Sequence, residues 1–305
     1  MTELRFDGRT AIVTGAGRGV GRAHALLLAE RGAAVVVADL GGQLDGSGSS
    51  SDPADEVVKE IDAAGGRAVA CFASVADESG AGSMVQTALD SFGSVDIVVN
   101  NAGIAAPDNF GDLDDSAFRR MADVHYFGTV NVVRAAWPHM VDAGYGRIVN
   151  TCSEAAFGIT PKATPYGGGK GGVYGFSRAL ATESLALGIR VNMVAPRANT
   201  RLAAPEVLAK TYDVPVEAFA DFTTMAAFKP ELVSPAAAYL AHESCALNGE
   251  VLVSGAGQVF RIAVLANEGI THDDLAPEHV AEGIERIMDL SGAHVIEAAT
   301  LGGEG

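Results

Sequence analysis

Thr10-Ala-Ile-Val-Thr-Gly-Ala-Gly-Arg-Gly-Val-Gly21 is the stretch that decides the fold of this 305-residue chain. Its first five residues are apolar or β-branched, which predicts a short buried strand. Gly15, Gly19 and Gly21 then predict a tight turn whose backbone can approach a pyrophosphate closely. The helical pattern that follows predicts a helix N-terminus, where free N–H groups and the helix dipole favour an anion. Strand, glycine turn and helix in this order indicate a dinucleotide-binding unit.

An acidic residue follows at the place where such units hold the adenosine ribose. Residues 34–38 (Ala-Val-Val-Val-Ala) predict a second apolar strand, and it ends at Asp39, roughly 20 residues after the glycine turn. A carboxylate at this point accepts hydrogen bonds from the ribose diol and repels a 2′-phosphate, so it favours NAD over NADP. The alternative is a plain strand-to-helix turn. Because the strand pattern and Asp39 are both present, we predict NAD as the cofactor.

Strand and helix patterns alternate without a linker from this unit to residue 254. Strands are predicted at 67–72, 95–99, 147–152, 189–194 and, as the last one, 250–254, and helices at about 54–64, 79–92, 115–140 (with a kink or break), 165–187 and 235–243. We therefore predict one doubly wound α/β domain with a parallel sheet, a Rossmann fold, over residues 1–260. Residues 197–230 lack a strand pattern and predict a helical insert that covers the substrate, or a plain helical connection. Residues 261–305 predict a helical appendage, whose amphipathic helix 275–290 packs on the body or on a partner subunit.

The composition excludes several classes of protein. The net charge is −17 and no basic run exists, which argues against a nucleic-acid partner. No apolar run is long enough to span a membrane, and residues 1–5 do not resemble a secretory signal. Cys71, Cys152 and Cys245 lie far apart, so we expect neither a disulfide framework nor a metal site. We expect a cytoplasmic protein with a small-molecule substrate, since residues 302–305 also carry no peroxisomal or retention signal.

A phenol and an ammonium stand four residues apart in Thr164-Pro-Tyr-Gly-Gly-Gly-Lys170. On a helix, Tyr166 and Lys170 lie on one face, and a cation beside a phenol lowers the tyrosine pKa, which suits proton exchange with an alcohol. Thr164 is expected to cap this helix and Pro165 to occupy its first turn. The glycines disfavour a helix by roughly 1 kcal/mol each relative to alanine. By itself such a pair is more often a solvated helix face.

Four motifs in this order resemble the short-chain dehydrogenase/reductase family. They are Thr14-Gly15-x-x-x-Gly19-x-Gly21, Asn100-Asn101-Ala102-Gly103, Ser153 and Tyr166-x-x-x-Lys170. The resemblance implies NAD(P)-dependent oxidation of a secondary alcohol or reduction of a ketone. It implies that Tyr166 is the general acid/base, that Ser153 holds the substrate oxygen, and that Lys170 binds the nicotinamide ribose and lowers the tyrosine pKa. The cofactor-binding residues that it implies are Gly15, Arg18, Gly19, Val20, Gly21, Asp39, Ser74, Val75, Asn101, Ala102, Gly103, Tyr166, Lys170 and Pro196.

Further segments are similar to one branch of this family, the (3R)-hydroxyacyl-CoA dehydrogenase domain of peroxisomal multifunctional enzyme type 2, also described as 17β-hydroxysteroid dehydrogenase type 4. They include Ala38-Asp-Leu-Gly-Gly42, Val124-His-Tyr-Phe-Gly128 and Tyr145-Gly-Arg-Ile148. The likeness implies a hydroxyacyl-CoA dehydrogenase of fatty-acid or sterol side-chain β-oxidation that forms a homodimer or homotetramer. The alternatives are a dehydrogenase of a free secondary alcohol or hydroxysteroid, and a catalytically silent NAD-binding protein.

Two positions near the expected cofactor depart from the family pattern. His125 stands where most members carry an asparagine that completes a proton relay. Either this part of the helix still serves the relay and His125 belongs to the catalytic set, or the ring only packs. Ala73 stands where an aspartate commonly contacts adenine, which leaves Ser74 or the backbone of Val75 for that contact.

A third departure brings arginines to the end of the sixth strand. Arg197 follows Pro196 where the family usually has glycine, and Arg201 lies one helical turn further on. A CoA ester is anionic, so in an acidic chain it needs local basic groups. Both arginines are therefore candidates for contacting cofactor or CoA phosphates. The alternative is that they are exposed surface side chains.

Overall fold

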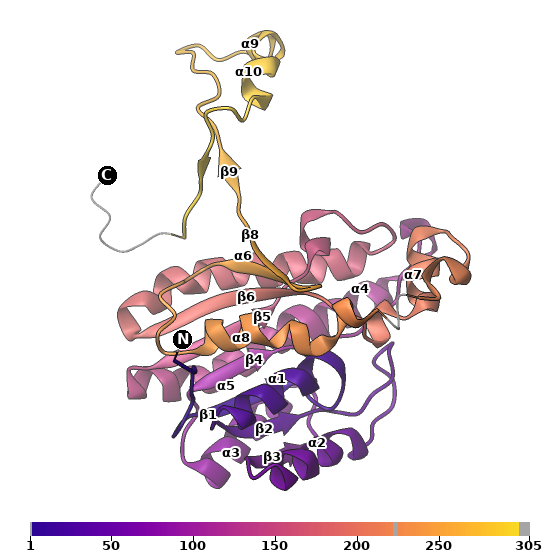
Figure 1. Ribbon diagram of the computed structural model, residues 1–305. Coiled ribbons are helices and arrows are strands. Elements are labelled where there is room, and N and C mark those ends of the chain that lie inside the picture. The colour runs from indigo at the N-terminus through magenta and orange to yellow at the C-terminus, as the bar shows by residue number, and fades with distance from the viewer. Residues whose placement is uncertain (1, 222–224, 299–305) are drawn as a thin grey trace.

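A mostly parallel sheet of eight strands, in the order β3-β2-β1-β4-β5-β6-β7-β8, organises the computed structural model, which describes residues 2–221 and 225–298 (Figure 1). The parallel strands are β1 (Thr10–Thr14), β2 (Ala34–Ala38), β3 (Arg67–Cys71), β4 (Ile97–Asn100), β5 (Gly146–Thr151), β6 (Ile189–Arg197) and β7 (Val251–Gly255). The predicted doubly wound α/β fold is confirmed. The described residues do not include 222–224, which belong to the expected insert. They also do not include 299–305, which contain residues 302–305, where no targeting signal was expected.

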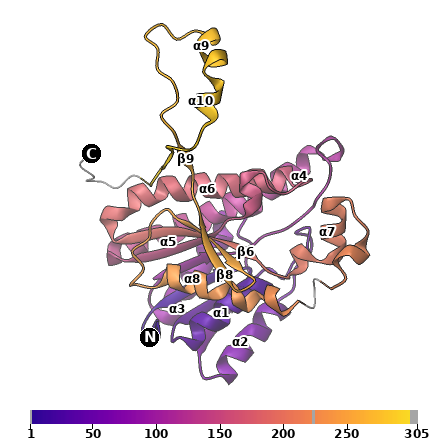
Figure 2. The same ribbon diagram turned by 45° about the horizontal axis from the view of Figure 1, so that its top comes forward.

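Helices cover both faces of this sheet (Figures 1 and 2). One layer holds α1 (Gly19–Glu30), α2 (Asp52–Ala63) and α8 (Ser234–Ala241), and the other holds α3 (Glu78–Phe92), α5 (Gly128–Ala143) and α6 (Thr164–Ser184). Side chains of a strand alternate between the faces, so in β1 Ala11 and Val13 join the first core and Ile12 joins the second. Burial on both faces explains why these strands are continuous apolar runs.

The helix expected over 115–140 is divided. α4 (Asp115–Met121) continues into a π-helical stretch, Ala122–Phe127, and then into α5. In place of the expected kink or break, the structure shows a change of helix type, because the residues stay helical from Asp115 to Ala143. π-Helical turns of this kind often occur at functional sites. The expected insert is helical, with α7 (Pro205–Tyr212) among short 3₁₀ turns. Among the described residues, no helix has the length and apolar character that crossing a membrane requires.

The prediction that residues 250–254 form the last strand is wrong. β8 (Gln258–Ile262) turns back and pairs antiparallel with β7, and the expected domain boundary after residue 260 falls inside it. The two-residue turn has positive φ at both Ala256 (51°) and Gly257 (73°). Such turns normally carry asparagine, aspartate or glycine at the first position, so an alanine there gives no sequence signal.

After β8 the chain forms a projecting arm, residues 263–298, whose tip with α9 and α10 stands away from the sheet and its helices in both views (Figures 1 and 2). The returning end of the arm contacts the body, where Arg178 of α6 donates to the carbonyl oxygen of Ile296 at 2.6 Å. It consists of a two-stranded antiparallel sheet, β9 (Leu265–Ala266) with β10 (His294–Val295), and the short helices α9 (Pro277–Glu282) and α10 (Ile284–Met288). The prediction of a single helix over 275–290 is wrong, because Gly283 separates α9 from α10. Since α9 and α10 do not pack on the body, packing on a partner subunit stays a prediction.

Candidate active site

A cavity of about 810 Å³ opens at the carboxyl ends of β1, β2, β4, β5 and β6. The strand order reverses between β1 and β4, and doubly wound folds bind ligands at such a point. Five cationic side chains and two carboxylates line it: Arg18, Arg119, Arg120, Lys170 and Arg201, with Asp39 and Asp123. The chain as a whole carries a net charge of −17. The excess of cations therefore makes this cavity a local site for an anionic ligand.

The glycine turn forms one wall of the cavity, and it fits a dinucleotide. Gly15 and Gly19 have positive φ, 62° and 54°, which glycine adopts without strain. A Cβ on Gly21 would overlap the carbonyl oxygen of Gly15, so α1 could not begin so close to the turn with any larger residue. Gly21 does not line the cavity, whereas Gly15, Arg18, Gly19 and Val20 do. The open, side-chain-free backbone is the shape that a pyrophosphate requires.

Asp39 connects the turn to the end of β2. Its Oδ2 accepts a hydrogen bond from the backbone N–H of Gly17 at 2.7 Å, and its Oδ1 accepts one from Gly41 at 2.6 Å. These bonds hold the carboxylate at the rim of the cavity, where a ribose diol could donate further hydrogen bonds to it. The position agrees with the ribose-binding role expected of Asp39.

Asn101 positions the turn from the opposite side. Its Nδ2 donates to the carbonyl oxygens of Thr14 (3.0 Å) and Gly15 (3.2 Å). The Thr14 hydroxyl accepts the backbone N–H groups of Asn101 and Ala102, both at 3.0 Å. The end of β4 is thus tied to the end of β1, and Asn101, Ala102 and Gly103 all line the cavity. This bracing of the turn by the Asn101 amide could not be predicted from the motif.

Ser153, Tyr166 and Lys170 converge on the cavity from β5 and α6. Ser153 follows β5 and caps a 3₁₀ turn, where its Oγ accepts the N–H of Ala155 at 3.2 Å. Its hydroxyl also forms a hydrogen bond with Tyr166, which lowers the pKa of the phenol. The Lys170 ammonium lies 5.9 Å from the centre of the Tyr166 ring. Three groups predicted from two separate motifs therefore lie together in one cavity wall.

The charge state of this group differs from the sequence-based expectation. Burial raises the pKa of Tyr166 above its ordinary value of 10.0, and the Ser153 hydrogen bond opposes that effect. Burial also lowers the pKa of Lys170 to about 8. The ammonium is directed at the carbonyl oxygen of Thr151, to which it donates at 2.6 Å. The expectation that Lys170 makes Tyr166 more acidic fails here, because desolvation of the phenolate dominates.

Several glycines of α6 in and just after the segment from Tyr166 to Lys170 have a packing role. At three positions of α6 an added Cβ would meet a neighbouring segment at closer than ordinary contact distance. These are Gly167 with the Ala155 carbonyl oxygen (2.9 Å), Gly169 with His125 Cβ (3.2 Å) and Gly172 with the Tyr126 ring (2.9 Å). Close packing on the 3₁₀ turn and the π-helical stretch thus outweighs the helix propensity that glycine lacks.

The start of α6 corrects one prediction. Thr164 is the first residue of the helix, and the preceding residue, Ala163, is its N-cap with no side-chain hydrogen bond. The prediction that Thr164 caps this helix is therefore wrong. Pro165 lies in the first turn, as predicted. If Thr164 were the N-cap, the helix would begin at Pro165, but it begins at Thr164 itself.

His125 is a buried side chain beside Tyr166. Its ring is 1% exposed and meets the Tyr166 ring edge-on, with 5.0 Å between centroids. Nε2 lies 2.9 Å from the carbonyl oxygen of Ile104, and burial lowers the pKa of the ring to about 3, with the Lys170 charge adding to the effect. The ring is thus neutral, and its Nε2 lies against the Ile104 backbone, 3.2 Å from the nitrogen as well as 2.9 Å from the carbonyl oxygen. This geometry favours the packing interpretation over a side-chain proton relay.

The predictions for the adenine-binding end of the cavity and for the two arginines after β6 do not all agree with the structure. Ser74 and Val75 line the cavity, as does Pro196. Arg197 forms a bidentate ion pair with Glu154, at 2.6 and 2.7 Å, and does not line the cavity. Its assignment to a ligand phosphate is therefore wrong. Arg201 does line the cavity and donates to the carbonyl oxygen of Gly42 at 3.2 Å, so it stays a candidate.

A buried polar chain anchors α6 to the sheet, and sequence reasoning did not find it. Asn100 donates to Asn150 at 2.9 Å, Asn150 donates to Ser177 at 2.9 Å, and Ser177 donates to the carbonyl oxygen of Val173 at 2.7 Å. These bonds join β4, β5 and α6, and α6 carries Tyr166 and Lys170. A helix weakened by glycine is thereby held in register by side chains that lie outside its motif.

A glycine turn, an acid and a cavity at the point where the strand order reverses define the Rossmann-like class of α/β proteins. Within that class, the family described as short chain dehydrogenase matches residues 9–207, and the chain belongs to this family of oxidoreductases. The resemblance inferred from the motifs is confirmed.

Two relatives and one solved structure illustrate the range of the similarity. A short-chain type dehydrogenase/reductase of Mycobacterium tuberculosis is 42% identical over 292 residues, covering 94% of this chain and 96% of that protein. Peroxisomal multifunctional enzyme type 2 of Mus musculus is 40% identical over 297 residues, which cover 95% of this chain but only 38% of that enzyme. The structure of a 7α-hydroxysteroid dehydrogenase with NADH and 7-oxo glycochenodeoxycholic acid has a TM-score of 0.71 and 30% identity, covering 84% of this chain and 98% of that one.

Proposed function

We propose that this chain is an NAD-dependent dehydrogenase that oxidises a (3R)-3-hydroxyacyl-CoA in fatty-acid or sterol side-chain β-oxidation. The observation that carries the proposal is the group Ser153, Tyr166 and Lys170 in a cavity lined by an excess of cations. Similarity to the mouse multifunctional enzyme supports this choice of substrate, although the chain spans well under half of that enzyme's length.

Arg119 and Arg120 support a CoA ester as the substrate. Both are exposed on α4, line the cavity, and form no salt bridge within residues 2–221 and 225–298. Guanidinium groups bind phosphate in a bidentate manner, and CoA carries three phosphates on its nucleotide part. We assign these two side chains, with Arg201, to the CoA phosphates.

The expected substrate-covering insert supports an acyl chain. From residues 197–230, the apolar side chains Leu202, Val207, Leu208 and Tyr212 line the cavity. They supply an apolar part of the cavity wall. A polar headgroup at the arginines and an apolar chain at the insert match the two halves of an acyl-CoA.

The reaction follows from the positions of the side chains. NAD, when bound, supplies the hydride acceptor for the alcohol carbon. Ser153 and Tyr166 already share a hydrogen bond, so a substrate hydroxyl that joins them is held beside both groups. Tyr166 Oη takes the hydroxyl proton during oxidation and returns it during reduction. Lys170 donates to the Thr151 carbonyl oxygen at 2.6 Å, which holds its ammonium in the same cavity wall as Tyr166.

The choice of NAD over NADP rests on Asp39, whose negative charge would repel a 2′-phosphate. Asp39→Asn keeps the size of the side chain and one acceptor for the turn, whereas Asp39→Ala removes the bracing as well. We expect both variants to lower the preference for NAD over NADP at least about tenfold, and comparison of the two separates charge from bracing. An unchanged ratio of kcat/KM for the two cofactors in Asp39→Asn would refute this assignment.

The substrate proposal is tested by NADH production with a panel of hydroxyacyl-CoA esters of different chain lengths, in both configurations, beside free hydroxy acids and hydroxysteroids. We expect the highest kcat/KM with a (3R)-hydroxyacyl-CoA. Arg119→Gln with Arg120→Gln should raise KM for CoA esters at least about tenfold and leave KM for a free alcohol unchanged.

A second candidate is a dehydrogenase of a free secondary alcohol or hydroxysteroid. The similarity to a hydroxysteroid dehydrogenase structure favours it, and so do the apolar side chains of the insert. Activity only on the free compounds would select this candidate. NAD binding without activity on any member of the panel would select the catalytically silent protein.

Assembly and location complete the proposal. We propose a cytoplasmic homodimer or homotetramer. On α6, Gly168 and Gly175 are exposed, and nothing lies within 4 Å of a Cβ added at either position, so a helix of a second copy could approach closely. The three cysteines are free and buried, which suits a reducing compartment. Light scattering at several protein concentrations tests the assembly, and a monomer at all of them would contradict it.

A further inference from the structure

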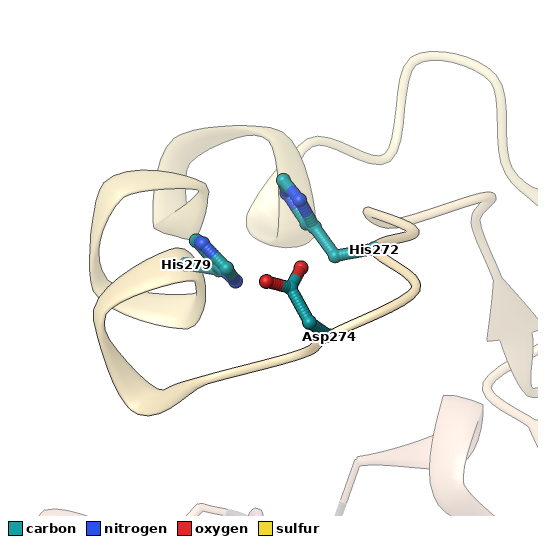
Figure 3. A group of neighbouring side chains, drawn as sticks. All are labelled: His272, Asp274 and His279. Carbon is teal, nitrogen blue, oxygen red and sulfur yellow. The ribbon is translucent and has the colours of Figure 1, made fainter.

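The projecting arm carries a group of potential metal ligands that the dehydrogenase reaction does not use. His272, Asp274 and His279 each offer a ligand atom, and these atoms all lie within 4.8 Å of one another. The carboxylate of Asp274 points toward the two imidazole rings (Figure 3). The rings of His272 and His279 are stacked, with 4.2 Å between centroids and 11° between planes. No arm residue lines the cavity among the described residues, so this group is separate from the active site.

The surroundings of the group favour a cation. Residues 263–298 contain eight acidic side chains and only one basic one, Arg286. His272 and Asp274 are exposed, and neither forms a side-chain hydrogen bond or ion pair in the part of the chain that the structure describes. Their lone pairs are therefore available without breaking any existing contact. A site of this charge attracts a divalent ion from solution.

His279 has a contact that binding of a metal would change. The backbone N–H of Ala276 donates to its Nδ1 at 3.2 Å, at the start of α9. This bond places the proton of the neutral ring on Nε2. A metal ion at Nε2 would move the proton to Nδ1, and a metal ion at Nδ1 would take the lone pair directly. In either case the Ala276 N–H loses its acceptor, which gives metal binding a local signature.

We propose that His272, Asp274 and His279 bind a divalent transition-metal ion, with Zn²⁺ as the ion that fits best. Two imidazoles and one carboxylate are a nitrogen-rich ligand set that suits Zn²⁺ and its neighbours, whereas Mg²⁺ and Ca²⁺ prefer oxygen ligands throughout. Three protein ligands leave the fourth tetrahedral position to water. The ion joins residues 272–274 to α9 and so fixes the tip of the arm.

The test is titration of the full-length, tag-free chain with Zn²⁺ by calorimetry, after removal of metals with a chelator. We expect one Zn²⁺ site per chain, with no competition from excess Mg²⁺. His272→Ala and His279→Ala should each weaken binding at least about tenfold, since even changes around a metal ligand commonly do so. The matched control is His294→Ala, which removes an exposed histidine of the same arm outside the group. Equal affinity in all four proteins, or an equal loss in the control, would overturn the proposal.

Hydrogen exchange gives a second readout that mere surface adsorption would not produce. Zn²⁺ should slow exchange of the backbone amides of residues 272–275 and 278–282, and it should speed exchange at Ala276, whose acceptor is lost. Co²⁺ should give the visible absorption of a tetrahedral site, and the His279→Ala variant should lack it. Binding that leaves exchange in this segment unchanged would place the ion elsewhere and contradict the proposal.

Discussion

The sheet with its cavity and the projecting arm of residues 263–298 differ most in what covers their apolar side chains. Every residue of β1 and β2 is buried, and helices lie on both faces of the sheet. In the arm, by contrast, Leu275, Met288 and Leu290 are exposed. Amphipathic patterns therefore form helices in both regions, but only in the first does the same chain supply the opposing surface. The comparison shows that an apolar stripe in a sequence predicts burial without saying which molecule provides the cover.

Polar groups follow the same division. Between the sheet and α6, the side chains of Asn100, Asn150 and Ser177 are buried and linked by hydrogen bonds. At the tip of the arm, His272 and Asp274 are exposed to solvent. The buried groups fix one arrangement of α6 against the sheet, whereas the exposed groups stay available to a ligand. Hydrogen bonds thus fix the positions of the buried polar side chains in the first region, whereas the exposed ones in the arm would be fixed only by a bound ligand.

The largest expected contrast is in core packing. Leu28 on α1 is 2% exposed, and Met288 on α10 is 71% exposed. Leu28→Ala should lower the free energy of unfolding by about 2–5 kcal/mol, because it leaves a cavity. Met288→Ala should change it by less than about 0.5 kcal/mol. Denaturant unfolding of both variants at low protein concentration measures the difference. A comparable loss of unfolding free energy in Met288→Ala would contradict this expectation, since it would mean that another surface covers Met288 in solution.

A second contrast concerns two glycines. An alanine Cβ at Gly21 would overlap the Gly15 carbonyl, whereas nothing lies within 4 Å of a Cβ at Gly292. Gly21→Ala should cost about 1–3 kcal/mol of stability through overpacking and should also weaken NAD binding, since the turn must move. Gly292→Ala should do neither. Calorimetric NAD binding, with unfolding curves of both variants, checks this expectation, and normal NAD affinity in Gly21→Ala would count against the assignment of the turn.

A smaller contrast appears at low pH. His24 is buried beside Ser234, 2.9 Å from its hydroxyl, and burial lowers the pKa of the ring to about 4. Between about pH 6.5 and about pH 4 the unfolded chain binds a proton here that the folded chain does not, so stability falls as the pH falls. At about pH 5.5 the loss is roughly 1.4 kcal/mol. His24→Asn should remove that part of the acid sensitivity.

The control for this prediction is His294→Asn in the arm, where the ring is exposed. Its unfolding free energy should depend on pH as that of the unmodified chain does. The measurement is denaturant unfolding at about pH 7.5 and about pH 5.5 for the three proteins. If His24→Asn keeps the full acid sensitivity, burial of His24 is not its cause.

The features that could be predicted from the sequence are those whose physical cause lies in neighbouring residues of the chain. The glycine turn and Asp39 were predictable, because positive φ and a carboxylate after a strand are local requirements. β8 was missed because its turn carries Ala256 at positive φ and its strand is mostly exposed. The break at Gly283 was missed because helical periodicity continues across it.

Site electrostatics depended on neighbours that are distant in the sequence. Glu154 pairs with Arg197 across 43 positions and removes it from the phosphate candidates. The pKa of Tyr166 rises because of burial, which motif spacing does not reveal. Arg119 and Arg120 line the cavity only because α4 lies at its rim. Residue type and spacing predicted that Ser153, Tyr166 and Lys170 form one group, but the pKa values of the group depend on burial in the fold.

The central claim is that Tyr166 transfers the proton in an NAD-dependent alcohol oxidation. The most direct test compares NADH production from a (3R)-hydroxyacyl-CoA by the unmodified chain and by Tyr166→Phe. Phenylalanine keeps the ring that meets His125 edge-on and removes only the hydroxyl. The account predicts a fall in kcat of at least about 100-fold, with unchanged NAD affinity and unfolding free energy. A Tyr166→Phe variant that retains most of its turnover would contradict it.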